Sequence, residues 1–306
     1  MKKAASWFIL AAGVLWGGMG VFVKILTGAG LSSVTVTSVR LFSAGVLLFL
    51  YLLLFEREKI RLPKKALFWV LVTALFSVLA MSSLYFIAID LTSLAVAAIL
   101  LYTAPVFVAV MSALFFKERF TGRKTLALAL AVAGCVLVAG LGGKFTPLGV
   151  LAGLGSGFAY ALYSIFGKFM LRHVHPFTAT AYTFLFAGLF SLLLADIPSV
   201  LTLFREGGAK PIAAALTVGL VTAAIPYLLY TWGLRYTEAG KASILATAEP
   251  LVATLFGILL YHEELTVPKT LGILLIAGAI VLLNTGKNKI DSEEPSCISR
   301  DPSSKA

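Results

Sequence analysis

The sequence has 306 residues, of which 59% are hydrophobic and 13% are charged, and its mean hydropathy is +0.97. A soluble domain does not need so much apolar surface, so these values exclude an ordinary soluble protein. The net charge of +11 would suit a nucleic-acid-binding protein, but basic residues also set the orientation of membrane proteins. The two cysteines, Cys135 and Cys297, indicate neither a disulfide framework nor a metal site.

Ten apolar runs are long enough to cross a bilayer, which takes about 20 mostly apolar residues per helix. They lie near 6–27, 33–55, 66–89, 93–116, 123–141, 148–170, 176–195, 210–234, 240–260 and 268–285. The first run follows Met1-Lys2-Lys3, as a secretory signal would, but it continues to Leu26 with only Lys24 as a charged residue, longer than the apolar core of a signal, and is interpreted as a span. After Gly286 the composition becomes polar and rich in proline, which predicts a disordered tail over 287–306.

The basic residues are distributed unevenly between the segments that join these runs. With the N-terminus in the cytoplasm, only Arg40 lies within a span and five basic residues face outward, which leaves 19 of the 25 on the cytoplasmic side. The five outward residues are Lys24, Lys144, Arg205, Lys210 and Lys269. This asymmetry predicts a plasma (inner) membrane protein with both termini in the cytoplasm, and no nucleic-acid partner is needed to explain the charge.

An internal repeat divides the chain into two similar halves. The segment ILLYTAPVFVAVMSALFFKERFTGRKTLALAL, from Ile99, matches ILATAEPLVATLFGILLYHEELTVPKTLGILL, from Ile244, at a constant offset of 145 residues. Near the N-terminus the offset is 144. Matched pairs include Pro105 with Pro250, Glu118 with Glu263, Tyr85 with Tyr230, Trp16 with Tyr160 and Lys24 with Lys168. The halves cover 1–143 and 144–286.

Five spans per half is an odd number, so the second half enters the membrane from the opposite side. The predicted fold is therefore an all-α membrane protein with ten transmembrane helices, arranged as two inverted five-helix repeats. The turn after the fourth run carries four basic residues, whereas its counterpart after the ninth keeps only Lys269, as expected if the two turns face opposite sides. Inverted repeats favour alternating access to a site near the middle of the membrane.

Several weak motifs recur in both halves of this ten-span arrangement. They are the Trp16-Gly17 pair in the first run, the prolines within the fourth and ninth runs, and the glutamate that closes each of those runs. Together they resemble the EamA type of the drug/metabolite transporter superfamily. The resemblance covers nearly the whole chain except the tail. It implies a plasma-membrane carrier without a cofactor, many members being exporters of amino acids and other metabolites, and it leaves the substrate open.

Polar and aromatic residues at helical spacing within the spans indicate a cavity, because lipid-facing positions favour aliphatic side chains. The repeat helps to select these candidates, because most of them occupy matched positions in the two halves. The expected substrate-binding residues are Trp16, Ser82, Tyr85, Tyr102, Tyr160, Tyr227, Tyr230, Thr247 and Glu249. Their aromatic faces could hold an apolar, aromatic or cationic group. The alternative is that the tyrosines and the tryptophan form interface belts or pack the interior.

Glu249 departs from the repeat, since its counterpart is Ala104. A carboxylate within a span is a functional candidate by default. Three roles remain open: it carries a coupled proton, binds a substrate amine, or donates as a neutral acid to the carbonyl freed by Pro250. Arg40 either binds a substrate carboxylate or pairs with Glu249.

Other residues are candidates for hinges, gates or corners. Pro105, Pro226 and Pro250 interrupt their helices, as hinges or as static kinks, and Pro226 has no matching proline in the first half. Lys24 and Lys168 either extend to lipid headgroups or form gating ion pairs. Glu118 and Glu263 are interpreted as structural corners that contact the N–H groups of the next helix, where Thr121 and Thr266 act as caps.

The sequence offers no basis for an enzyme. Ser156 has no histidine within the spans to activate it, and Glu249 has no acidic partner for an aspartyl protease. No phosphate-binding loop or cluster of metal ligands is present in the sequence. The expected partners are a small-molecule substrate, the lipid bilayer and, in one of the roles of Glu249, protons. A channel or uniporter with the same fold remains the alternative to a secondary transporter.

Overall fold

The computed structural model describes residues 2–119, 121–140 and 146–285, apart from the side chains of residues 2, 3, 24 and 261. The expected disordered tail, 287–306, lies outside the described residues. In the first half the helices are α1 (Lys2–Gly17), α2 (Met19–Gly28), α3 (Ser33–Phe55), α4 (Lys64–Val72), α5 (Ala80–Leu91), α6 (Leu94–Leu101), α7 (Ala104–Phe116) and α8 (Gly122–Ala139). A short 3₁₀ turn, η1 (Arg57–Ile60), follows α3, and a π-helical segment, η2 (Thr73–Leu79), joins α4 to α5.

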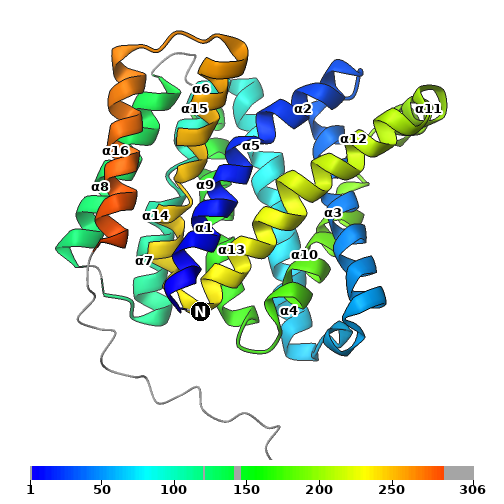
Figure 1. Ribbon diagram of the computed structural model, residues 1–306, viewed down its shortest axis with the longest axis horizontal. Helices are drawn as coiled ribbons and strands as arrows, with labels where there is room; N and C mark the ends of the chain where they lie inside the picture. Colours follow the sequence, from blue (N-terminus) through cyan, green and yellow to red (C-terminus); the bar gives the residue numbers. More distant parts are fainter. Residues whose placement is uncertain (1, 120, 141–145, 286–306) are drawn as a thin grey trace, which may run out of the picture.

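The second half also contains eight α-helices. Its helices are α9 (Pro147–Met170), α10 (Pro176–Ser191), α11 (Ile197–Gly207), α12 (Ala209–Gly219), α13 (Ile225–Tyr236), α14 (Ala239–Leu245), α15 (Ala248–Tyr261) and α16 (Val267–Asn284), and a π-helical segment, η3 (Leu220–Ala224), joins α12 to α13. Every one of these elements is helical, and Figure 1 shows them gathered into one bundle. The all-helical membrane class predicted from the sequence is confirmed.

Nine helical stretches of the described residues are long and apolar enough to cross a membrane. They are Ala4–Gly28, Ser33–Phe55, Lys64–Leu91, Leu94–Phe116, Gly122–Ala139, Pro147–Met170, Ala209–Tyr236, Ala239–Leu260 and Val267–Asn284. The expected span at 176–195 falls short. Its helix α10 has 16 residues, or about 24 Å at 1.5 Å per residue, against about 30 Å of hydrocarbon. It ends at Ser191 because a turn follows and Asp196 then caps α11, with Pro198 in the first turn of that helix.

The two halves pack against each other through corresponding helices. α3 packs along α10 and α8 along α16, while α1 packs on α13 and α15, and α9 packs on α5, α6 and α7. In Figure 1 the N-terminus and the turn from α7 to α8 lie at the lower end of the bundle, and the turn from α15 to α16 lies at the upper end. Side chains from both halves therefore meet in the middle.

Threonine caps begin two helices where the sequence predicted them. Thr121 Oγ1 accepts a hydrogen bond from the Lys124 backbone N–H at 3.4 Å, and Thr266 Oγ1 accepts one from the Lys269 N–H at 3.5 Å. These contacts satisfy donors that a helix start leaves without an internal partner. The caps at Thr121 and Thr266 are confirmed, and they define the corners between α7 and α8 and between α15 and α16.

Candidate substrate site

An aromatic cluster lies where the two halves meet, and Trp16 on α1 is at its centre. The Trp16 ring lies 4.8 Å from Tyr227, 5.5 Å from Tyr230 and 6.5 Å from Tyr160, measured between ring centroids. Trp16, Tyr227 and Tyr230 are buried, and Tyr160 is half-buried. Tyr163, which the sequence did not single out, joins the cluster 5.0 Å from Tyr227. Four of the expected site residues, from α1, α9 and α13, are therefore brought together.

Glu249 lies in the first turn of α15, on the edge of this aromatic cluster. The Tyr160 hydroxyl donates a hydrogen bond to its Oε2 at 3.4 Å. Tyr85 and Tyr102, both half-buried, lie within electrostatic reach of the same carboxylate. Hydroxyl-bearing rings from α5, from α9 and from the break between α6 and α7 are thus near the carboxylate.

Arg40 on α3 is buried and has few partners for its five donors. Its Nη1 donates to the Met19 sulfur, and its Nε has no hydrogen-bond partner. The guanidinium is within electrostatic reach of Tyr227 and Glu249, but no ion pair within 4.0 Å joins Arg40 to a carboxylate of the described residues. The Trp16 Nε1 is also buried without a partner. Buried donors are almost always hydrogen-bonded, so two unsatisfied donors beside one aromatic cluster require an explanation.

Two expected site residues lie apart from the cluster. Ser82 lines a separate cavity of about 270 Å³, between α3, α5 and α10, together with Ser38 and Asp90. Its hydroxyl bonds to the carbonyl of its own helix at Val78, 3.0 Å away. Thr247 is buried, and its hydroxyl bonds to the Ile244 carbonyl at 2.6 Å. Neither of these two hydroxyl groups makes a hydrogen bond to Glu249 in the described part of the chain.

A smaller cavity, of about 20 Å³, lies beside Tyr160 and Tyr230. Its lining is mostly apolar and includes Pro105, with the hydroxyl groups of Ser164 and Ser243 on one part of it. A cavity needs roughly 10–15 Å³ to hold a water molecule, so by volume this one has room for a single water.

The helix that precedes each of the matched prolines is interrupted. α6 ends at Leu101 and α7 begins at Ala104, directly before Pro105, while α14 ends at Leu245 and α15 begins at Ala248, directly before Glu249-Pro250. Each proline lacks the N–H that would bond the carbonyl four residues earlier, at Leu101 and at Ala246, and the Ala246 carbonyl accepts the Glu249 N–H instead, at 3.0 Å. Whether the prolines act as hinges or as fixed kinks stays a prediction.

Glycines of the opposite half lie against these interruptions. A Cβ on Gly157 would lie 3.2 Å from the Leu101 carbonyl oxygen, and a Cβ on Gly13 would lie 3.3 Å from the Ala246 oxygen. The backbones of α9 and α1 can therefore approach these two carbonyls closely, which a larger residue would prevent.

The π-helical segments η2 and η3 were not expected from the sequence. They occupy matched positions, since η3 corresponds to the last five residues of η2 at the offset of 145. Pro226 follows η3, whereas Met81 stands at the matched position after η2, so proline is not required for the π turn. Such turns are common at functional sites, and no propensity or periodicity signal would have found them.

The corner glutamates differ in their surroundings. The Glu118 carboxylate accepts hydrogen bonds from the Ala239 and Gly240 N–H groups, at 2.8 Å and 3.1 Å. These donors start α14, in the other half, so the expectation that Glu118 contacts the next helix, α8, is wrong. Thr121 already caps α8, and Lys117 turns the chain with a left-handed backbone. Glu263 instead pairs with Lys269 at 2.9 Å.

Of the two matched lysines, Lys24 and Lys168, only Lys168 has a described side chain. Lys168 on α9 is half-buried and lies within electrostatic reach of Glu118 and Glu238, without an ion pair within 4.0 Å. Lys24 lies in α2, but its side chain is outside the described residues. No group of three metal-ligating side chains occurs in the described part of the chain.

A helical bundle of membrane-crossing length, with a polar and aromatic cluster between its halves, defines a multi-pass membrane protein of the transporter class. The chain matches the EamA-like transporter family over residues 3–140 and 147–285, and it belongs to this family. An uncharacterized transporter of Archaeoglobus fulgidus is 34% identical over 282 residues, covering 92% of this chain and 96% of that protein.

Other relatives are similar to this chain, and a solved structure has a similar fold. The uncharacterized transporter YwfM of Bacillus subtilis is 27% identical, covering 96% of this chain and 98% of its own. The uncharacterized inner membrane transporter YicL of Salmonella typhimurium is 26% identical, covering 90% and 93%. One crystal structure matches with a TM-score of 0.76 at 18% identity over 92% of this chain and 96% of that chain, which shows the same fold.

Proposed function

We propose that the protein is a secondary transporter that exports small zwitterionic metabolites, such as amino acids, by alternating access. The observation that carries the proposal is the pair of unmatched charges at the centre, Arg40 and Glu249. They lie on the two halves, within electrostatic reach of each other but without an ion pair. A zwitterion presents one carboxylate and one ammonium, which complements both charges at once.

The donors and acceptors of the cluster suit such a ligand. The unsatisfied Arg40 Nε and Trp16 Nε1 are available to a carboxylate, and the Glu249 carboxylate, oriented by Tyr160, is available to an ammonium group. The rings of Tyr227 and Tyr230 would then surround the side chain of the substrate. Charged groups inside a membrane are expensive, so a ligand that neutralises both would be bound preferentially over one that neutralises neither.

Two inverted five-helix repeats, with α10 as the short tenth span, would provide the alternating access. Three observations support this arrangement. The family matches the chain in two segments that divide near the boundary expected from the repeat. Contacts between the halves recur at matched positions: α1 packs on α13 and α15, and its counterpart α9 packs on α5 and α7. The turn from α7 to α8 and the turn from α15 to α16 lie at opposite ends of the bundle in Figure 1. The distribution of basic residues supports an inner-membrane protein with both termini in the cytoplasm.

Uptake into proteoliposomes tests the substrate class. The probes are phenylalanine, phenethylamine, which lacks the carboxylate, and 3-phenylpropionate, which lacks the ammonium group. We expect phenylalanine to inhibit transport more strongly than either of the other two probes. The Arg40→Gln variant should no longer distinguish phenylalanine from phenethylamine, and the Glu249→Gln variant should no longer distinguish it from 3-phenylpropionate. Arg57→Gln, at an exposed position in η1 just after α3, is the matched control. Equal inhibition by all three probes in the parent protein would refute the zwitterion assignment.

A channel of the same fold is distinguished by counterflow. Preloading vesicles with substrate accelerates exchange through a carrier and does not do so through an open pore. Proton coupling is tested separately, with Glu249→Gln and the parent compared between about pH 5 and pH 8. Unchanged pH dependence in the variant would rule out Glu249 as the proton carrier and leave amine binding as its role.

A further inference from the structure

The two glutamate corners have the same backbone but differ in what their carboxylates contact. α7 ends at Lys117 with φ of 56°, and α15 ends at the matched His262 with φ of 52°. The next N–H bonds in both cases to a carbonyl of the same helix, Glu118 to Ser112 at 3.3 Å and Glu263 to Gly257 at 3.2 Å. The corners are thus equivalent up to the glutamate side chain, where they diverge.

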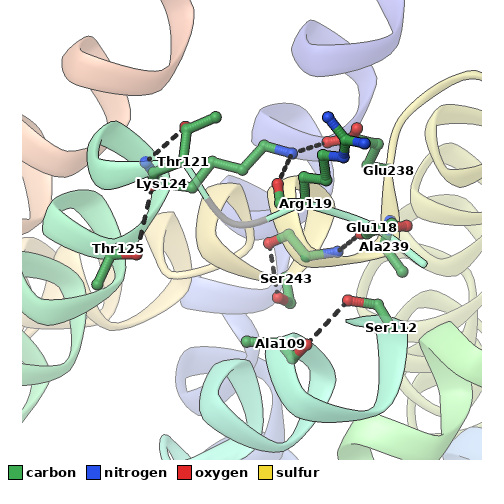
Figure 2. A network of polar contacts seen from close by, with 11 residues as sticks. Ala109, Ser112, Glu118, Arg119, Thr121, Lys124, Thr125, Glu238, Ala239 and Ser243 are labelled. Carbon is green, nitrogen blue, oxygen red and sulfur yellow. Dashed lines mark hydrogen bonds and ion pairs between the residues drawn. The ribbon is translucent and has the colours of Figure 1, made fainter. Parts of the chain in front are cut away.

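At the first corner the glutamate joins the two halves. Figure 2 shows Glu118 directed at the start of α14, where its carboxylate accepts the Ala239 and Gly240 N–H groups at 2.8 Å and 3.1 Å. The same face carries an ion pair between Lys124 and Glu238, the residue that precedes α14. α14 is mostly buried here, and Ala239 is fully covered.

At the second corner the equivalent contact is absent and the glutamate stays within its own half. Glu263 pairs with Lys269 at 2.9 Å, and about half of its side chain is exposed, at 51%. α6 is the counterpart of α14, and its first residue, Leu94, is 63% exposed. α7 packs against α14, whereas α15 and α6, the matching pair, share at most a marginal contact in the described part of the chain. The Glu118 carboxylate thus joins the two halves at its end of the bundle, and the Glu263 carboxylate does not.

We propose that Glu118 and Glu263 form a pair of alternating latches, one at each end of the transport path. Each glutamate has two positions, and the structure shows one position at each corner. In the first, the carboxylate bridges to the start of the opposite half's interrupted helix and closes that end. In the second, it pairs with the lysine six residues later, Lys124 or Lys269, and that end is open.

The opposite conformation follows by exchanging the roles of the two halves. Glu263 then leaves Lys269 and accepts the Leu94 and Ala95 N–H groups at the start of α6, which are the matches of Ala239 and Gly240. Glu118 leaves α14 and pairs with Lys124. Each carboxylate keeps a partner in both conformations, because a backbone N–H pair is replaced by an ammonium group. This latch rests on the inverted-repeat arrangement of the proposed function and not on its substrate.

One sequence difference between the corners accounts for how far Glu263 folds back. A Cβ added to Gly257 would lie 3.0 Å from the Glu263 carboxylate, so the glycine leaves room for it over α15. The match of Gly257 is Ser112, which is fully buried and fills the same space on α7. Glu118 in its released position therefore extends toward Lys124 and does not lie back on α7.

Thiol labelling in lipid nanodiscs tests the latch without any substrate. In a background lacking Cys135 and Cys297, a single cysteine replaces Ser243, which is buried on α14, or its match Ala98, which is half-exposed on α6. A water-soluble maleimide should label the Ala98→Cys protein and spare the Ser243→Cys protein. Glu118→Gln should raise labelling of Ser243→Cys about tenfold, the change expected when a helix-start acceptor is lost. Ala98→Cys labelling should fall.

The matched variants give opposite expectations. Glu263→Gln should leave Ser243→Cys protected, because the second latch is already open, and the double variant should expose both cysteines. Glu264→Gln, the exposed neighbour, should behave as the parent. The latch is refuted if Glu118→Gln leaves Ser243→Cys protected, or if Glu118→Gln and Glu263→Gln change labelling alike.

A backbone variant keeps the test decisive should Glu118→Gln fail to fold. Ala239→Pro removes one of the two donors to Glu118, and proline is tolerated at the first position of a helix. The preceding Glu238 already has the extended backbone that proline requires, with φ of −60° and ψ of 144°. Ala239→Pro should expose Ser243→Cys, and the matched Leu94→Pro should not. Because labelling needs no transport, a wrong substrate assignment and a wrong latch give separable results.

Discussion

Gly157 offers a sharp test of the packing between α9 and the interrupted helix α6–α7. A Cβ at this position would lie 2.7 Å from the Leu100 carbonyl oxygen and 2.8 Å from the Thr103 hydroxyl oxygen. Real Cβ atoms do not approach so closely, and a carbonyl oxygen cannot rotate away as the end of a flexible side chain can. Gly157→Ala must therefore push the two helices apart by several tenths of an ångström.

The cost follows from the kind of clash. Adding one methyl group to a packed interior costs about 1–3 kcal/mol when neighbours cannot yield. At about 2–4 °C per kcal/mol for a chain of roughly this size, the Tm of the purified protein should fall by about 2–12 °C. The gain in helix propensity from glycine to alanine, about 1 kcal/mol, acts in the opposite direction and must be controlled.

Two other glycines supply that control. Gly278→Ala on α16 meets nothing within 4 Å, so it reports helix propensity alone. Gly13→Ala, the match of Gly157, would lie 3.0 Å from the Ala248 Cβ and should fall between the two. Thermal unfolding in one detergent, followed by intrinsic fluorescence, should rank Gly157→Ala lowest. A Tm for Gly157→Ala equal to that of Gly278→Ala would refute the close packing.

Three further predictions concern stability. Burial lowers the pKa of His175, whose Nδ1 caps α10, below its ordinary 6.5. The folded protein therefore binds a proton at His175 less readily than the unfolded chain, so its stability should fall as the pH drops below about 6.5. In Tm measurements from about pH 8 to pH 5.5, the His175→Asn variant should lose less stability on acidification than the parent protein. Tyr230→Phe leaves the buried Ser164 hydroxyl without its partner, the Tyr230 hydroxyl 2.7 Å away. It should lower the free energy of unfolding, measured by denaturant titration, by about 1–3 kcal/mol. The double variant with Ser164→Ala should lose less than the sum of the two single variants. Arg123→Gln removes the hydrogen bond, 2.5 Å long, to the Leu282 carbonyl, and should speed amide exchange at the end of α16 without changing α3; equal exchange in both proteins would contradict this contact.

Much of the architecture could be predicted from the sequence because it is encoded locally. A membrane helix needs an apolar run of fixed length, so nine of the ten expected runs appear as helices of sufficient length. The prolines at 105 and 250 mark the interrupted helices because a missing donor acts within one turn. Trp16, Tyr160, Tyr227 and Tyr230 could be grouped because the repeat related their positions before any contact was known.

Other features depend on partners that are far away in the sequence, and only the tertiary structure decided them. Glu118 and Glu263 have equivalent local sequences, yet one reaches α14 and the other pairs with Lys269, because the two ends of the bundle are packed differently. Arg40 forms no ion pair with the described residues although Glu249 is in electrostatic reach. The distance between the two charges is set by where the bundle holds α3 and α15, and not by either helix alone. Hydropathy and turn chemistry act over a few residues. Closing one end of a bundle while the other stays open is a property of all its helices together.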